Sequence, residues 1–174
     1  GFTYLCMLLN AVEMQYGNSI KKNLVYWDEE YINALNEYKV KIDFTTSINI
    51  SYPKRFSLDW FKKSIFRKMY GRDMFYNKEI NLLLEEMNID VLFGVNNLHL
   101  DRIRWVSWIQ DFQHTHLPGF FSDKEICSRE TEYKKRAKYA NKVILSSEAV
   151  KKDFIKLYPE YKFKASVMQF VANV

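Results

Sequence analysis

The sequence has little cysteine and no long apolar run. Its 174 residues include two cysteines, Cys6 and Cys127, which lie far apart and lack the spacing of metal ligands. This argues against a disulfide framework and a cysteine-based metal site. No apolar run approaches the roughly 18 residues of a transmembrane helix, and no signal-peptide pattern is found. The sequence therefore predicts buried, reduced thiols and a cytoplasmic protein.

Glycine and proline are also scarce, with five and three residues, and there is no internal repeat or low-complexity tract. Hydrophobic residues make up 48% of the chain, which is enough for a sizeable core and too many for a disordered protein. The length fits one domain, or one domain with an appendage, and a single domain is predicted to span residues 1–174.

Positive charge is concentrated in one segment. Residues 54–72 hold seven bases and one acid, an excess of +6 in a chain whose whole net charge is +5. The remainder of the protein is therefore close to neutral.

Apolar runs and helical periodicities alternate along the chain. A helix is predicted from the first residues to Tyr16, with Gly17 as its stop. Further helices are predicted at 28–38, 57–70, 74–87, 124–140 and 147–158, with Asp28, Ser57 and either Ser146 or Ser147 as N-caps. Strands are predicted at 23–27, 39–44, 89–94, 102–110, 141–146 and 166–171.

This alternation indicates an α/β fold with a doubly wound, mostly parallel, Rossmann-like sheet covered on both faces. Such a sheet normally begins with a central strand. Here the first element is a helix led by Gly1, so we expect the first strand to be missing from this stretch and to lie upstream of it.

A polar cluster follows the strand predicted at 102–110. It contains Asp111, Gln113, His114 and His116. In doubly wound sheets ligands bind beyond the carboxyl ends of the strands, which is where this cluster and the loop residue His99 fall. The histidines could bind a ligand or tie down their own turn, and Asp111 and Gln113 could act on a ligand or cap the turn.

The stretch DFQHTHLPGFFS resembles a signature in the N-terminal domain of family 4 glycosyltransferases, which are retaining enzymes of the GT-B fold. The matching residues are Asp111, Gln113, His114, Pro118, Phe120, Phe121 and Ser122. A helix with Arg129, Tyr133 and Ala137 and the segment 140–154 follow the same pattern. The sequence departs from the pattern at Gln110, where many relatives have histidine.

The resemblance implies the N-terminal, acceptor-side half of a GT-B fold. Its substrates would be a nucleotide sugar and a glycan or lipid-linked acceptor in surface polysaccharide or glycolipid synthesis, with no cofactor and no catalytic metal. It implies catalytic roles for His114 and Asp111. It implies substrate contacts from Gln113 and from Gly1, the last near the donor diphosphate. His116 and His99 are further candidates for substrate contacts because of their position at the same end of the sheet. Pro118, Phe120 and Phe121 are expected to pack. The C-terminal nucleotide-sugar domain of the family is not found in these residues.

The basic segment 54–72 supports a rival hypothesis. Leu58, Phe61, Ile65 and Met69 share one face of its predicted helix. The residues predicted to contact a membrane surface are Trp60, Lys62, Lys63, Arg67 and Lys68. A basic amphipathic helix can lie on an anionic membrane, or it can be a surface helix packed on the sheet. Nucleic acid is disfavoured, since no nucleic-acid motif accompanies the charge. The rival is thus a non-catalytic α/β module that binds a polyanion or the inner face of a membrane peripherally.

Overall fold

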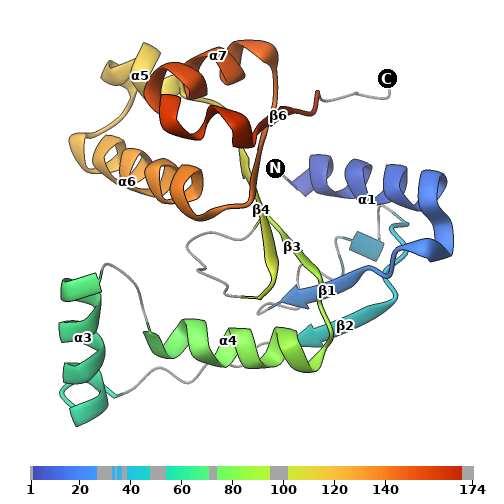
Figure 1. Ribbon diagram of the computed structural model, residues 1–174, viewed down its shortest axis with the longest axis horizontal. Coiled ribbons are helices and arrows are strands. Elements are labelled where there is room, and N and C mark those ends of the chain that lie inside the picture. Colours follow the sequence, from blue (N-terminus) through green and yellow to red (C-terminus); the bar gives the residue numbers. More distant parts are fainter. Residues whose placement is uncertain are drawn as a thin grey trace. The chain divides into compact units, whose positions relative to one another are not determined.

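The computed structural model describes residues 2–26, 33, 35–36, 39–47, 54–70, 74–94 and 102–169 (Figure 1). The chain divides into two compact units, residues 1–52 and 53–174. Every strand pair of the described chain is parallel, and several helices lie between strands along the chain. The predicted α/β class with parallel strands is confirmed. The described strands form a two-stranded sheet in the first unit and a four-stranded sheet in the second.

The first unit begins with helix α1 (Phe2–Tyr16), followed by a 3-10 turn η1 (Gly17–Ser19). Gly17 has φ +49°, a left-handed conformation that glycine adopts at no steric cost, and it ends α1 as predicted. Strands β1 (Asn23–Tyr26) and β2 (Phe44–Ser47) pair in parallel. Cys6 packs with Leu35 and Val40 in the core of this unit.

A buried lysine joins the elements of the first unit. The Lys22 ammonium lies 2.5 Å from the Glu13 carboxylate on α1, and the Lys22 backbone N–H donates to the Asp43 carboxylate at 2.7 Å. Lys41 donates to the other Glu13 oxygen at 2.9 Å. The hydrogen bond that the Lys22 ammonium donates to Glu13 raises the pKa of Lys22 and lowers the pKa of Glu13. The ion pairs therefore compensate the burial of the Lys22 charge.

The strand predicted at 39–44 is wrong. Residues 39–43 are not in a strand, and Lys39 is in the left-handed region with φ +51°. The strand occupies Phe44–Ser47, because the parallel register begins with Asn23 opposite Phe44. The helix predicted at 28–38, with its cap Asp28, lies mostly outside the described residues.

The second unit holds the four-stranded sheet, in the order β3-β4-β5-β6. Its strands are β3 (Val91–Phe93), β4 (Arg104–Ile109), β5 (Lys142–Leu145) and β6 (Ala165–Val167). Its longer helices are α3 (Leu58–Tyr70), α4 (Met74–Glu86), α6 (Asp123–Tyr139) and α7 (Glu148–Leu157). Short helical turns are α5 (Gln113–His116), η2 (Pro118–Phe120) and η3 (Pro159–Lys164). The predicted strands and helices of this unit all occur, with boundaries shifted by a few residues.

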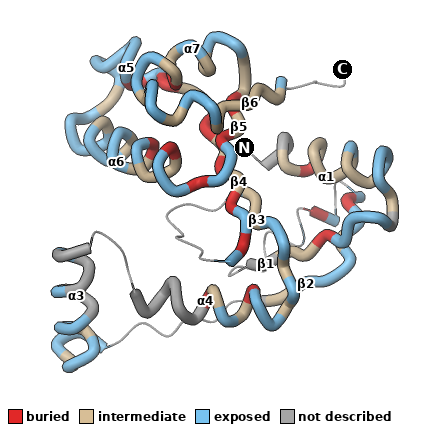
Figure 2. The backbone as a smooth tube through the Cα atoms, in the orientation of Figure 1, coloured by how far each residue is buried: buried red, intermediate tan, exposed pale blue. Residues whose placement is uncertain are grey.

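Buried residues gather along β4, β5 and the helix faces turned toward them (Figure 2). Alternate residues of the two strands point the same way, as the pleat requires. They pack with residues of α6 and α7, so both helices cover the same face of the sheet. The cluster consists of Trp105, Ile109, Phe112, Tyr133, Ala137, Ala140, Val143, Leu145 and Phe154.

Local capping fixes the ends of the helices. The Ser122 hydroxyl accepts the Glu125 N–H, and the Glu125 carboxylate accepts the Ser122 N–H, which is a capping box at the start of α6. Ser147 caps α7, and Ser57 accepts the Trp60 N–H at the start of α3. At the other end of α6 the Lys164 ammonium donates to the carbonyls of Ala137 and Lys138. Ser122, the last residue of the stretch DFQHTHLPGFFS, thus has a structural role.

Candidate functional site

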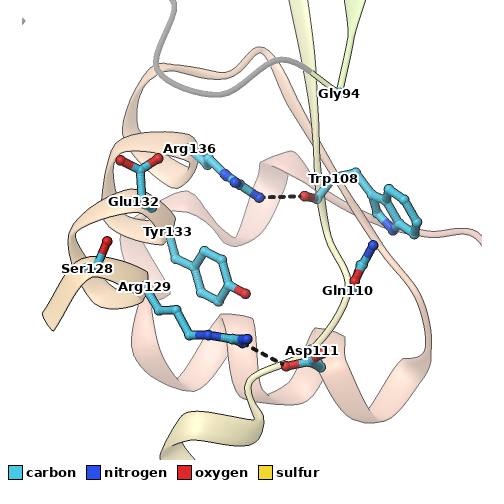
Figure 3. Close-up of a pocket in the computed structure, with 9 residues that line it drawn as sticks. All are labelled: Gly94, Trp108, Gln110, Asp111, Ser128, Arg129, Glu132, Tyr133 and Arg136. Atoms are coloured by element: carbon cyan, nitrogen blue, oxygen red, sulfur yellow. Dashed lines mark hydrogen bonds and ion pairs between the residues drawn. The ribbon is translucent and has the colours of Figure 1, made fainter. Parts of the chain in front are cut away.

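A cavity of about 370 Å³ lies between the carboxyl end of β4 and helix α6 (Figure 3). It is therefore at the edge of the parallel sheet where ligands of doubly wound folds bind. The residues that line it are Gly94, Trp108, Gln110, Asp111, Ser128, Arg129, Glu132, Tyr133 and Arg136.

One face of α6 forms a wall of this cavity. Arg129, Glu132, Tyr133 and Arg136 stand at positions i, i+3, i+4 and i+7, which share a helix face. Arg129 and Tyr133 match a family pattern in the sequence, but neither is among the predicted site residues. The helical spacing of these polar side chains, directly after the polar cluster, is the signal that could have found them.

Asp111 lines the cavity and caps its own turn at the same time. Its Oδ1 accepts the Gln113 backbone N–H at 3.0 Å and lies 3.4 Å from Nη1 of Arg129. The two interpretations left open by the sequence are therefore compatible. The Gln113 side chain is exposed and does not line the cavity, so its predicted substrate contact stays a prediction.

The two arginines of the wall differ in their surroundings. Arg129 lies over the ring of Phe121, 4.7 Å from its centre, and its side chain is 37% exposed. Arg136 lies over the Tyr133 ring, and its Nη1 donates to the Trp108 carbonyl at 2.8 Å. Burial lowers the pKa of Arg136. Arg136 thus ties α6 to β4, whereas Arg129 faces the open part of the cavity.

His114 is buried, with 2% of its surface exposed, and it does not line the cavity. Its ring lies among those of Phe112, Phe121 and Tyr133, with the nearest ring centre, that of Tyr133, at 5.5 Å. Burial, and then the charge of Arg129, lower the pKa of His114. The catalytic role expected for His114 stays a prediction, while its position is that of a core residue that supports the Asp111 turn.

The second histidine of the cluster connects two helices. Nε2 of His116 lies 2.7 Å from the Asp153 carboxylate, which joins α5 to α7 on the surface. Its predicted substrate contact is not tested by this geometry. Three packing expectations are wrong: Pro118 and Phe120 are exposed on η2, and Cys127 is exposed on α6. Cys6 is buried as predicted. Phe121 packs against His114 and Arg129, as expected for a packing residue.

Two predicted site residues are not described by the structure, and the predicted membrane-surface residues belong to another helix. Gly1 and His99 fall outside the described residues, as do the side chains of Lys63 and Arg67. Trp60, on α3, packs between Phe56 and Phe61, with ring centres 5.4 and 5.0 Å away. Lys62 and Lys68 are exposed on the same helix. The predicted membrane-surface residues are thus on one helix, remote in sequence from the cavity.

The cavity offers hydrogen-bonding groups of several kinds. Its carboxylates can accept hydrogen bonds from hydroxyl groups, and its guanidinium groups can donate to oxyanions. The amide of Gln110 and the hydroxyl groups of Ser128 and Tyr133 can both donate and accept hydrogen bonds. Within the described ranges, no group of three or more histidine, cysteine or acidic side chains is placed to hold a metal ion. None of the helices in the described part of the chain is long and apolar enough to span a bilayer. Compared with protein-family models, with curated proteins and with solved structures, the chain matches none.

Proposed function

We propose that the chain is the acceptor-side domain of a retaining glycosyltransferase, which transfers a sugar from a nucleotide sugar to a glycan or lipid-linked acceptor. One observation carries the proposal. The stretch that resembles the family 4 signature begins where β4 ends, and its first residue, Asp111, lines a cavity at the carboxyl edge of a parallel sheet. The family resemblance supplies the expected partner, a second domain that holds the nucleotide sugar.

In this proposal the chain binds and orients the acceptor. Sugar hydroxyls are recognised by groups that accept and donate hydrogen bonds in fixed positions, and Asp111, Gln110 and Tyr133 are such groups at this cavity. Holding the acceptor hydroxyl close to the donor converts a bimolecular step into an effectively unimolecular one. A closed cleft also excludes water, which would otherwise compete as the acceptor.

Filling the cavity should block transfer. In the protein encoded by the complete gene, Ser128→Trp is expected to lower kcat/KM for the acceptor by at least about tenfold, or 1.4 kcal/mol, because the indole would occupy acceptor space. Ser128 is exposed on α6 at the cavity wall. The measurement is transfer from a panel of nucleotide sugars to extracted lipid-linked and glycan acceptors.

Thr131→Trp is the matched control, since Thr131 is exposed on the same helix and does not line the cavity. It should leave kcat/KM within about twofold. The proposal fails if the wild type uses no nucleotide sugar, or if Ser128→Trp and Thr131→Trp behave alike.

A second candidate function, binding to an anionic membrane, is favoured by the surface of α3. Leu58, Phe61 and Ile65 lie at i, i+3 and i+7, and they are 79%, 48% and 58% exposed. Lys62 and Lys68 are exposed on the same helix. In the described structure these three apolar residues are therefore not packed in the core. An ordinary surface helix packed on the sheet would have buried them. An apolar face beside basic residues is typical of helices that lie in a membrane interface.

Charge reversal tests this candidate. The Lys62→Glu, Lys68→Glu double variant should bind phosphatidylserine vesicles at least about thirtyfold more weakly, at about 1 kcal/mol for each base near the surface. Wild-type binding should also weaken with salt. The measurement is co-sedimentation with vesicles, and Lys124→Glu, Lys134→Glu on α6 is the control with the same change in charge. Equal effects of the two double variants would show that only net charge matters and would remove the role of α3.

A further inference from the structure

The cavity contains a guanidinium group, that of Arg129, which is held by its neighbours and retains donors for a ligand. We infer that Arg129 binds an oxyanion, a phosphate or carboxylate, carried by the molecule that enters the cavity. The inference rests on the proposed function for the identity of that molecule, an acceptor, and it adds the chemical class of acceptor: a hydroxylated group with an anionic substituent.

The contacts of Arg129 with Asp111 and with the Tyr133 side chain leave part of the guanidinium available. Nη1 lies 3.4 Å from Oδ1 of Asp111, whereas charge-assisted hydrogen bonds of this kind are usually about 2.7–2.9 Å long. The same Oδ1 already accepts the Gln113 N–H at 3.0 Å. A guanidinium has five donors in a planar fork, and the fork matches two oxygens of a phosphate or carboxylate. An incoming oxyanion can therefore form the shorter, bidentate contact that Asp111 does not.

The ring of Phe121 holds this guanidinium in place. Arg129 lies 4.7 Å from the Phe121 ring centre, and Phe121 in turn packs edge-on against the buried ring of His114. The arginine therefore loses less conformational freedom on binding than a free surface side chain would. The close-up shows Arg129 extending from α6 toward the end of β4, with Tyr133 beside it (Figure 3).

The other groups of the cavity suit the uncharged part of such a ligand. Arg136 is engaged with the Trp108 carbonyl at 2.8 Å, two turns along the helix from Arg129. Ser128, Gln110 and Tyr133 lie on the same cavity and offer hydroxyl and amide groups. A volume of about 370 Å³ is near the lower end of small-molecule pockets, about 300–1,000 Å³. The cavity therefore fits a single small polar group with one anionic substituent rather than a long chain.

Asp111 gives the inference a distinctive test. Its carboxylate stands beside Arg129 and repels an incoming anion. Asp111→Asn removes this charge, and the amide oxygen can still accept the Gln113 N–H, so the turn is retained. Arg129→Lys keeps the charge and loses the fork, and Arg129→Gln loses both. If Arg129 and Asp111 formed a purely structural pair, substitution of either residue would weaken it. If Arg129 is an anion site, Asp111→Asn should raise the affinity for the anion and Arg129→Gln should lower it.

The experiment titrates the 174-residue chain with glucose 6-phosphate, glucuronate, inorganic phosphate and glucose, by calorimetry and by the NMR signal of the Arg129 side chain. Binding of at least one of the three anions is expected to be at least about tenfold tighter than binding of glucose. Comparison of the phosphate and carboxylate arms identifies which oxyanion is preferred. Arg129→Gln should lose at least tenfold in affinity, Arg129→Lys should fall between, and Asp111→Asn should gain several-fold. Lys134→Gln, an exposed cation on the same helix, should change nothing.

Three results would overturn the inference: equal binding of glucose and the anions, unchanged anion affinity in Arg129→Gln, or no gain in Asp111→Asn. No transfer step is involved in this titration. If no anion binds, but the wild type transfers sugar and Ser128→Trp blocks that transfer, only the oxyanion site is rejected. Anion binding without any transfer would instead reject the glycosyltransferase and retain the site.

Discussion

Replacing His114 by alanine is expected to lower the free energy of unfolding by about 3 kcal/mol. The ring is 2% exposed and lies among three aromatic side chains, so its removal leaves a cavity in a packed core. Large-to-small substitutions of buried rings cost about 3–5 kcal/mol, and the imidazole is the smallest of these rings. Chemical denaturation of the purified chain gives the measurement.

The pH dependence of stability provides an independent reading of the same ring. Burial is the main cause that lowers the pKa of His114 in the folded protein. The unfolded chain, in which the ring titrates near pH 6.5, therefore binds a proton at a higher pH than the folded chain does. Stability from this group is present above about pH 6.5 and is lost as the pH falls toward the folded value. The charges of Arg129, Glu130, Asp111 and His116 act on the same titration.

Two variants separate packing from chemistry. His114→Phe fills the site without a titrating group, so it should retain most of the stability and lose the decline below pH 6.5. His116→Ala is the exposed control and should cost well under 1 kcal/mol, as surface ion pairs usually do. If His114→Ala were as stable as the wild type but failed to transfer sugar, His114 would be the catalytic residue that the sequence predicts.

The largest loss of stability is expected at Phe154. This residue of α7 is fully buried in the cluster formed by β4, β5, α6 and α7, and its ring lies 5.4 Å from that of Tyr158. Phe154→Ala should lower the free energy of unfolding by about 4 kcal/mol. The neighbouring side chains cannot fill the space left by the ring unless a helix moves. Such a loss is comparable to the whole stability of a marginal domain.

Leu157→Ala is the matched control for Phe154→Ala, since Leu157 lies three residues further along α7 and is partly exposed. It should cost about 1 kcal/mol or less. Thermal and urea unfolding of both variants, monitored by circular dichroism, decides between them. Similar melting temperatures for Phe154→Ala and the wild type would mean that α7 does not pack on the sheet as described.

Helix starts that depend on local chemistry could be predicted from the sequence, whereas the start of one strand, which depends on its pairing, could not. Ser57 and Ser147 mark helix starts because their hydroxyls accept backbone N–H groups three residues on. The alternation at 39–44 is typical of a strand, yet the strand begins only at Phe44. Its start depends on the register with Asn23, a partner distant in sequence.

The same distinction applies to the site. Asp111 could be placed at the carboxyl edge of the sheet because it directly follows a strand. His114 could not be assigned to the core, because its burial depends on Phe121 and Tyr133, which reach it only after α6 folds back. Arg129 was matched to a family pattern without a role, since its contact with Asp111 spans a turn, a cap and a helix start.

The order β3-β4-β5-β6 has a consequence for synthesis on the ribosome. In the second unit, β4, β5 and β6 each pair with the strand that precedes them in the chain. The sheet can therefore grow by the addition of one strand at a time to its existing edge. When β5 has emerged from the ribosome, it can already pair with β4. Phe154 of α7 then packs on the apolar surface formed by β4, β5 and α6. Chains elongate more slowly than strands pair, and contacts close in sequence form fastest. We therefore expect vectorial, stepwise folding of this unit, in which each newly exposed strand edge is open for aggregation only until the next strand arrives.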